Sequence, residues 1–248
     1  MSVWITGDCH GDFHRFTLEG FPQQKGMGRD DYMIICGDHG GVWAGERADG
    51  YKLDWLENRP FTTLFVDGNH ENFDLLNAYP EKEWHGGRGH EIRPHVLHLM
   101  RGQIFDIGGS TWFAMGGAAS HDIQDGILDP ALPDFERRYW VLRRMNARFR
   151  VLGYSWWPEE MPSGAEYAEA EANLERAGWR VDHILTHCAP SGILPQIDRG
   201  YRPDALTDFL ETVRQRCRFS AWYLGHYHRE MALEQKYFPR RERISEIG

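Results

Sequence analysis

From residue 3 to residue 11 the chain reads VWITGDCHG, an apolar run that ends directly at an aspartate and a histidine. The same arrangement returns in four more segments, which are YMIICGDHG at 32–40, TTLFVDGNHE at 62–71, HILTH at 183–187 and AWYLGHYH at 221–228. Random placement rarely repeats one pattern five times, so each apolar run is interpreted as a buried strand. Polar side chains at strand ends mark the functional site of layered α/β proteins. The five segments therefore predict strands that converge on one charged site.

The remaining segments alternate with these strands as helices and loops. Helices are expected over residues 12–18, up to residues 55–58, and over 72–78, 163–177 and 205–218. Ser163 and Glu166 have the spacing of a capping box at the start of the fourth helix. A hairpin is expected to join residues 95–105 to 111–115 around Gly108-Gly109, and residues 237–247 to form a final edge strand.

We expect one domain over residues 1–248, with an irregular, cap-like segment at about 122–162. This segment mixes prolines with a basic run that includes Arg143, Arg148 and Arg150. A run of this kind more often forms a solvated helix face than a phosphate site. The segment is too short and too poor in apolar residues to build a core of its own.

Bulk composition restricts the class of protein. The 248 residues are 41% hydrophobic and 26% charged, which is ordinary for a globular protein. A net charge of −9 disfavours a broad electrostatic surface for duplex nucleic acid. No run is long enough to span a bilayer, and no secretory signal is recognisable. We expect a cytoplasmic protein without a membrane partner, and the oligomeric state is left open.

Four cysteines, Cys9, Cys36, Cys188 and Cys217, show no CxxC spacing and no paired pattern. Three of them lie next to candidate metal ligands, which raises thiolate coordination as an alternative. We interpret them instead as small apolar side chains beside tight turns in a reducing compartment.

Seven side chains in the five segments have the chemistry of metal ligands. On an extended segment, side chains two residues apart share a face, so Asp8 and His10 can point at one ion, as can His226 and His228. A tetrahedral zinc takes four donors, so seven donors with one bridging carboxylate indicate two ions. Two cations about 3.5–4 Å apart can generate hydroxide and hold both oxygens of a displacement at phosphorus. The seven residues are Asp8, His10, Asp38, Asn69, His187, His226 and His228.

The segments resemble the five signature blocks of the calcineurin-like metallophosphoesterases, in the same order. The resemblance implies an α/β fold of two packed mixed β-sheets flanked by helices, a four-layer sandwich with a dinuclear site at the strand ends. It implies that His70 contacts the phosphoryl group and protonates the leaving oxygen. It places one ion among Asp8, His10, Asp38 and His228, and the other among Asp38, Asn69, His187 and His226. The two divalent ions could be Mn, Fe, Zn, Co or Ni, because the donor set suits all of these.

One block departs from the phosphoprotein phosphatase branch of this family. That branch continues its second block with Val-Asp-Arg-Gly, which supplies an arginine clamp and an aspartate that pairs with the catalytic histidine. Here the block continues with HGGVW at residues 39–43. The missing arginine disfavours phosphoprotein substrates, and the partner of His70 stays undefined. The last block, with His226 and His228, resembles the phosphodiesterase and nuclease branches.

Three further residues are candidates for substrate contact. His39 could reach the phosphate or bond to a loop carbonyl. His121 follows the flexible Gly116-Gly117 and could face the site or be an ordinary loop residue. Trp157 could stack on a nucleotide base if the cap-like segment lies over the metals, or it could fill the core.

These observations predict a metal-dependent phosphoesterase, a hydrolase that cleaves phosphodiesters or small, nucleotide-like phosphate esters by attack of metal-activated hydroxide. A nuclease or a nucleic-acid-end phosphatase is the nearest alternative, and a basic groove leading to the site would favour it. A non-catalytic metal-binding scaffold is the alternative from another class, but such a scaffold is expected to have lost ligands. The expected partner is a small phosphate ester, and nucleic acid is not favoured.

Overall fold

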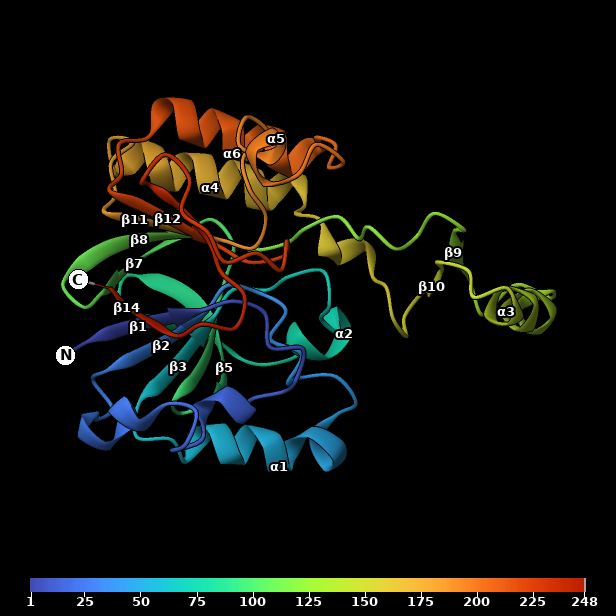
Figure 1. Ribbon diagram of the computed structural model, residues 1–248, viewed down its shortest axis with the longest axis horizontal. Helices are drawn as coiled ribbons and strands as arrows, with labels where there is room; N and C mark the ends of the chain where they lie inside the picture. Colours follow the sequence, from blue (N-terminus) through green and yellow to red (C-terminus); the bar gives the residue numbers. More distant parts are fainter. Residues whose placement is uncertain (248) are drawn as a thin grey trace.

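Two β-sheets pack face to face in the computed structural model, which describes residues 1–247 (Figure 1). One sheet has seven strands in the order β14 (Ser245–Ile247), β1 (Val3–Thr6), β2 (Tyr32–Ile35), β3 (Thr62–Phe65), β6 (Val96–Leu99), β5 (Gly87–Arg93) and β4 (Glu81–Trp84). The other has five, in the order β13 (Tyr237–Pro239), β12 (Ala221–Leu224), β11 (His183–Thr186), β8 (Ser110–Met115) and β7 (Gln103–Ile107). Both sheets contain parallel and antiparallel pairs. The predicted fold class is confirmed.

Helices cover the outer face of each sheet, which completes four layers (Figure 1). The seven-stranded sheet is covered by α1 (Glu46–Glu57) and by two 3-10 turns, η1 (His14–Phe16) and η2 (Pro22–Gly26). The five-stranded sheet is covered by α4 (Gly164–Arg176), α5 (Leu194–Ile197) and α6 (Ala205–Arg216). A short helix, α2 (Phe73–Leu76), follows β3, with Asn72 as its N-cap.

The apolar runs exist because both faces of the central strands are buried. In β2, Ile34 faces the core between the sheets, and its neighbour Met33 faces the core under α1. In β8, Trp112 faces the space between the sheets, and Phe113 faces the core under α4 and α6. A strand covered on both sides has no solvent face, so its sequence is apolar throughout rather than alternating.

Two predictions of strand pairing were wrong because the chain changes sheets. Residues 95–105 do not form one strand: β6 belongs to the seven-stranded sheet, and β7 pairs with β8 in the other. The turn at Gly108-Gly109 is as predicted, and both glycines have positive φ, as a type I′ turn requires. Residues 237–247 likewise split into β13 and β14, which belong to different sheets.

The helix predictions fared better. The helices at 163–177 and 205–218 are confirmed as α4 and α6, and α4 has the predicted capping box. The helix ending near 55–58 is α1, and the one at 72–78 is the shorter α2. Residues 12–18 form only the single turn η1. The hairpin of β4 and β5 was missed because its sequence, EKEWHGGRGHEIR, is mostly polar.

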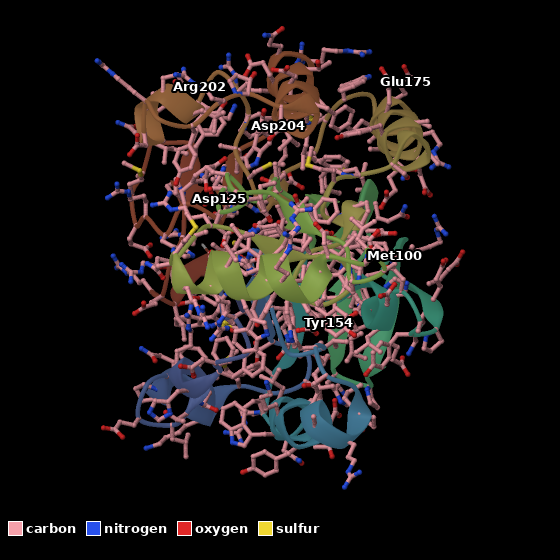
Figure 2. The ribbon with its side chains drawn as sticks, turned by 90° about the vertical axis from the view of Figure 1, so that its right-hand side faces the viewer. Met100, Asp125, Tyr154, Glu175, Arg202 and Asp204 are labelled. Carbon is pink, nitrogen blue, oxygen red and sulfur yellow. The ribbon has the colours of Figure 1, made fainter. Side chains whose placement is uncertain are left out.

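We call residues 122–155 the arm. The arm contains β9 (Ile127–Leu128), α3 (Phe135–Arg144) and β10 (Arg150–Val151), and β9 pairs in parallel with β10. No residue of α3 is buried. The helix stands away from the sheets in Figure 1, and Figure 2 shows it in front of the middle of the body. A third 3-10 turn, η3 (Pro158–Glu160), follows the arm.

Among residues 1–247, every helix is too short or too polar to traverse a lipid bilayer.

The core between the sheets should dominate stability. Trp112 is 1% exposed and its indole donates to the Ile107 carbonyl, whereas Trp140 on α3 is 57% exposed. We expect Trp112→Ala to lower the free energy of unfolding by about 3–5 kcal/mol, because it leaves a cavity between two sheets. Trp140→Ala, the matched control, should change it by less than about 0.5 kcal/mol. Urea denaturation of both variants tests this, and similar losses would contradict the assignment of the core.

Candidate metal centre

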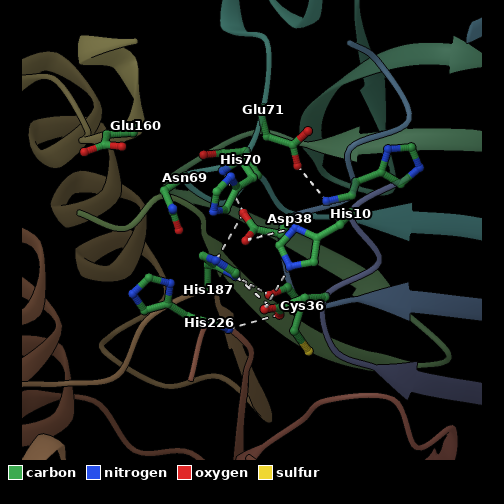
Figure 3. A network of polar contacts seen from close by, with 12 residues as sticks. His10, Cys36, Asp38, Asn69, His70, Glu71, Glu160, His187 and His226 are labelled. Atoms are coloured by element: carbon green, nitrogen blue, oxygen red, sulfur yellow. Dashed lines mark hydrogen bonds and ion pairs between the residues drawn. The ribbon is translucent and has the colours of Figure 1, made fainter. Parts of the chain in front are cut away.

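Five strand ends meet at one edge of the sandwich, and each carries predicted ligands (Figure 3). Strands β1, β2 and β3 are parallel neighbours, so their C-terminal ends lie side by side. The same holds for β11 and β12 in the other sheet. The first three strands bring Asp8, His10, Asp38, Asn69 and His70, and the other two bring His187, His226 and His228.

Asp8, His10 and His228 form the first group of ligand atoms, all within 4.8 Å of one another. His228 Nε2 lies 3.0 Å from Asp8 Oδ2 and 3.3 Å from His10 Nε2. Donor atoms that each bind one metal at about 2.0–2.2 Å are separated by roughly 3–3.5 Å. The spacing of this group therefore fits a shared cation.

Asp8, Asp38 and His187 form the second group. His187 Nδ1 donates to the Cys36 carbonyl at 2.7 Å, which turns Nε2 toward Asp38 Oδ1 at 3.3 Å. Hydrogen bonds of this kind orient metal-ligating histidines. The other Asp38 oxygen, Oδ2, lies 3.8 Å from His10 Nδ1. The two oxygens of Asp38 thus face imidazoles of different groups.

Buried polar atoms without hydrogen-bond partners indicate whether these residues suit a metal ion. Asn69 Oδ1 and His187 Nε2 are buried without any hydrogen-bond partner. Leaving such atoms unpaired is costly, so they normally have a partner in the native state. Asn69 Oδ1 has a lone pair to offer, as does His187 Nε2 once it is deprotonated, and Figure 3 shows His187 turned toward Asp38. A divalent cation would satisfy them.

The buried carboxylates at this edge of the sandwich also favour a positive charge close to them. Burial opposes a charged imidazole at His187, yet Asp38 and Asp8 raise its pKa to about 10. Burial and the neighbouring His187 lower the pKa of His226 well below its usual range, so that ring is neutral, as a metal ligand must be. Without a cation, the two carboxylates hold a proton on His187. A metal ion would replace that proton.

The backbone is strained at four of the ligands. His10, Asp38, His226 and His228 all have positive φ, between 46° and 67°. Such conformations cost about 1–3 kcal/mol each and persist only where the surroundings enforce them. Here each one turns the chain sharply after a strand, so that the ligand side chain faces the common edge.

Glycines allow these turns to approach one another. A Cβ at Gly37 would overlap the His187 ring, one at Gly68 would overlap Asp38 Oδ1, and one at Gly225 would overlap Asp8 Oδ1. These three glycines, each next to a proposed ligand in the sequence, are therefore a requirement of close packing.

Charged side chains support the ligands from behind, and sequence reasoning did not assign them this role. Glu71 accepts from the amides of His39 and Gly40, at 2.7 and 3.1 Å, and so fixes the loop after Asp38. Arg15 donates to the Asp8 carbonyl at 2.7 Å. The buried Asp67 accepts from Arg101 and lies 3.1 Å from His98 Nε2, which holds the loop before Asn69. All of these partners are at least seven residues apart in sequence.

The cysteines are buried, free thiols, as predicted. Burial raises the pKa of Cys9 to about 12 and that of Cys36 well above its usual range. Both thiols are therefore neutral, and neither belongs to the groups of candidate ligand atoms among the described residues. Cys36 takes part in the site only through its carbonyl.

For two predicted substrate contacts, the structure favours the alternative role that the sequence left open. His39 is fully buried, its ring stacks on Phe65 with centroids 4.0 Å apart, and its Nδ1 accepts from the Gly41 amide. Burial lowers the pKa of His39 to about 3, so it is a neutral core residue. Trp157 is 4% exposed, and its indole donates to Asp74 at 2.8 Å. Its ring packs edge-on against Trp43, which favours a structural role for this side chain.

His121 lies at the site. Its Nε2 is 2.6 Å from His226 Nε2, and its ring packs on Tyr201. The loop after β8 therefore reaches the ligand group, and a substrate contact by His121 stays a prediction.

His70 lies beside the ligands and bonds to the arm. Its amide donates to Asp38 Oδ1 at 2.8 Å, and its ring packs edge-on against His10. His70 Nε2 is 3.2 Å from Nη2 of Arg150, and Arg150 is paired with Asp122. The sequence placed Arg150 in a basic run typical of a solvated face, and no local signal connects it to a residue 80 positions away.

Two hollows flank the ligands. One, of about 700 Å³, is lined by His10 and His228 together with Arg15 and Arg241. The other, of about 610 Å³, is lined by His121, Tyr201, Arg148 and Arg202. A molecule bound at the ligands therefore has room on two sides.

The family model of the calcineurin-like phosphoesterases matches residues 1–230 of the chain. The chain therefore belongs to this family, which confirms the resemblance and makes the protein a metal-dependent phosphoesterase by family. No match was found among curated proteins.

The close packing at Gly68 can be tested. We expect Gly68→Ala to lower metal content and the melting temperature together, because the added methyl group displaces Asp38. Gly164→Ala is the matched control: a Cβ there meets nothing within 4 Å, and alanine favours the first turn of α4. Elemental analysis and thermal unfolding measure both effects. Full metal content in Gly68→Ala would contradict the packing argument.

Proposed function

We propose that this calcineurin-like phosphoesterase hydrolyses phosphodiesters or small, nucleotide-like phosphate esters at a centre of two divalent transition-metal ions. The main support for this proposal is that donor side chains from five strand ends surround two buried carboxylates. Because two unpartnered donor atoms face the same space, the cluster suits cations better than a network of hydrogen bonds.

The proposed ligands are Asp8, His10, Asp38 and His228 for one ion, and Asp38, Asn69, His187 and His226 for the other. The opposed directions of the two Asp38 oxygens support a bridging role. When bound, such ions supply an activated water and neutralise charge on the phosphoryl oxygens. Mn, Fe, Zn, Co and Ni all suit the mixed imidazole and oxygen donors.

We propose that His70 is the general acid, which donates a proton to the leaving oxygen. The hydrogen bond from its backbone amide to Asp38 fixes its position relative to the proposed ligands. Its ring packs on His10 and belongs to neither group of ligand atoms. A side chain held beside the cluster can reach the substrate without competing for a metal.

The two hollows support esters with substituents on both sides of the phosphorus. With the phosphoryl group at the ligands, one substituent would extend toward Arg15 and Arg241 and the other toward His121 and Tyr201. A diester uses both hollows, and a small monoester uses one.

The alternatives have less support. Neither hollow is uniformly basic, because Asp12 and Glu19 line one and Asp198 and Asp204 line the other. A nuclease would need a continuous basic track to neutralise successive phosphates. A non-catalytic scaffold is disfavoured because all seven donors and His70 are retained.

The dinuclear assignment predicts a stoichiometry. Stripped protein titrated with Mn²⁺ should bind two ions per chain. Asp38→Ala should weaken both sites because it removes the bridge, whereas Asn69→Ala should weaken only one. His95→Ala, whose imidazole bonds to Glu57 away from the ligands, is the control and should bind two. A wild-type chain that saturates at one ion would refute the dinuclear centre.

The role of His70 predicts a second pattern. His70→Ala should keep its metal content but lose turnover by about 10²–10⁴-fold, the usual contribution of a general acid. The loss should shrink for nitrophenyl esters, whose leaving group needs little protonation. Steady-state kinetics on an alkyl and a nitrophenyl ester, with parallel metal analysis, separate the effects. Metal loss in proportion to activity would show that His70 is a ligand instead.

A further inference from the structure

The arm brings one guanidinium to the metal centre. Arg150 is the first residue of β10, and its side chain is only 17% exposed, although α3 of the same arm has no buried residue. Its Nη2 lies 3.2 Å from His70 Nε2. Among six arginines between residues 137 and 150, this is the one that contacts a proposed catalytic side chain.

Asp122 fixes the direction of this guanidinium. Its carboxylate accepts from Arg150 Nε at 2.9 Å and from Nη2 at 2.5 Å, a two-point contact that holds the plane of the group. Within residues 1–247, Arg150 Nη1 donates to no protein group. The arrangement thus keeps donor N–H groups available at the site.

The contact with His70 shows where Arg150 directs its donors. A guanidinium stays protonated and can only donate hydrogen bonds, so an N–H group of Arg150 points to the position beside the proposed general acid. An anionic oxygen placed between the two side chains would accept from Arg150 and free His70 from this contact.

We propose that Arg150 binds a non-bridging oxygen of the scissile phosphoryl group, and that Asp122 is its positioning residue. The inference rests on the proposed phosphoesterase function and adds an anion contact beside His70. The segment after Asp38, HGGVW, has no arginine, and Arg150 approaches from an entirely different part of the chain. Planar guanidinium groups suit this task because they bond to phosphate at two points.

A purely structural role for Arg150 makes different predictions. If the ion pair with Asp122 only anchored the arm, its loss would loosen the arm and leave anion affinity unchanged. Phosphate binding therefore separates the two roles, and it does so without turnover.

The test uses metal-loaded full-length protein and inorganic phosphate as the probe, with affinity measured by calorimetry. Arg150→Ala should weaken phosphate binding by about 10–100-fold, as expected for loss of a charge-assisted contact, with metal content unchanged. Arg150→Lys should recover part of the affinity because the charge remains. Arg144→Ala is the matched control, since Arg144 is exposed on α3, and it should bind like wild type.

Asp122→Asn tests the positioning role. It should weaken phosphate binding less than Arg150→Ala, and the double variant should be no weaker than Arg150→Ala alone, because Asp122 acts through Arg150. Additive losses would show that Asp122 acts independently and would overturn its assigned role.

The proposal is overturned if Arg150→Ala binds phosphate like wild type while proteolysis shows a loosened arm. Measurements of ester hydrolysis by the wild-type protein distinguish failure of this proposal from failure of the proposed function. A wild-type protein that hydrolyses no ester but binds phosphate through Arg150 would refute the function and retain the anion site. If the wild-type protein hydrolyses esters but Arg150→Ala binds phosphate with unchanged affinity, the proposed function is retained and the anion site is refuted.

Discussion

Two buried carboxylates on adjacent parallel strands determine how this edge of the sandwich is built. Asp8 and Asp38 are almost fully buried, and burial of two negative charges is tolerated only with compensating partners. Backbone amides of His226 and His70 donate to them, and histidines surround them. The strained backbone of four ligands and the glycines beside them follow from the same requirement, because these turns bring every donor within reach of the carboxylates.

The ligands come from both sheets, which links the site to the architecture. Asp8, His10, Asp38 and Asn69 follow strands of the seven-stranded sheet, and the remaining three follow strands of the five-stranded sheet. Apolar packing between the sheets is contributed by residues such as Trp112 and Ile5. Ions held at this edge would add a polar connection between the layers, so metal affinity and the stability of the sandwich are coupled.

What could be predicted from sequence was local. The strand ends and the polar side chains that follow them were recognisable because an apolar run and its polar terminus lie within ten residues of each other. The burial of His39 and Trp157 could not be settled from the sequence because it depends on contacts with Phe65 and Asp74, which are distant in sequence. Only residues 100–102 separate β6 from β7, and a single glycine, Gly102, is a weak signal that the chain leaves one sheet for the other there. The contact of Arg150 with His70 depends on the path of the whole arm.

The weak attachment of the arm has a dynamic consequence. Its aromatic side chains Phe135, Tyr139 and Phe149 pack mainly on one another, and Leu132, Trp140, Val141, Met145 and Tyr154 are exposed. Segments with so little buried apolar surface open at a lower free energy than the sheets they adjoin. Amide protons of α3 should therefore exchange with solvent long before those of β1 or β11. The Arg150 guanidinium that contacts His70 is thus carried by a segment that opens more readily than the sheets, so the position of this charge beside the proposed ligands depends on how the arm is attached.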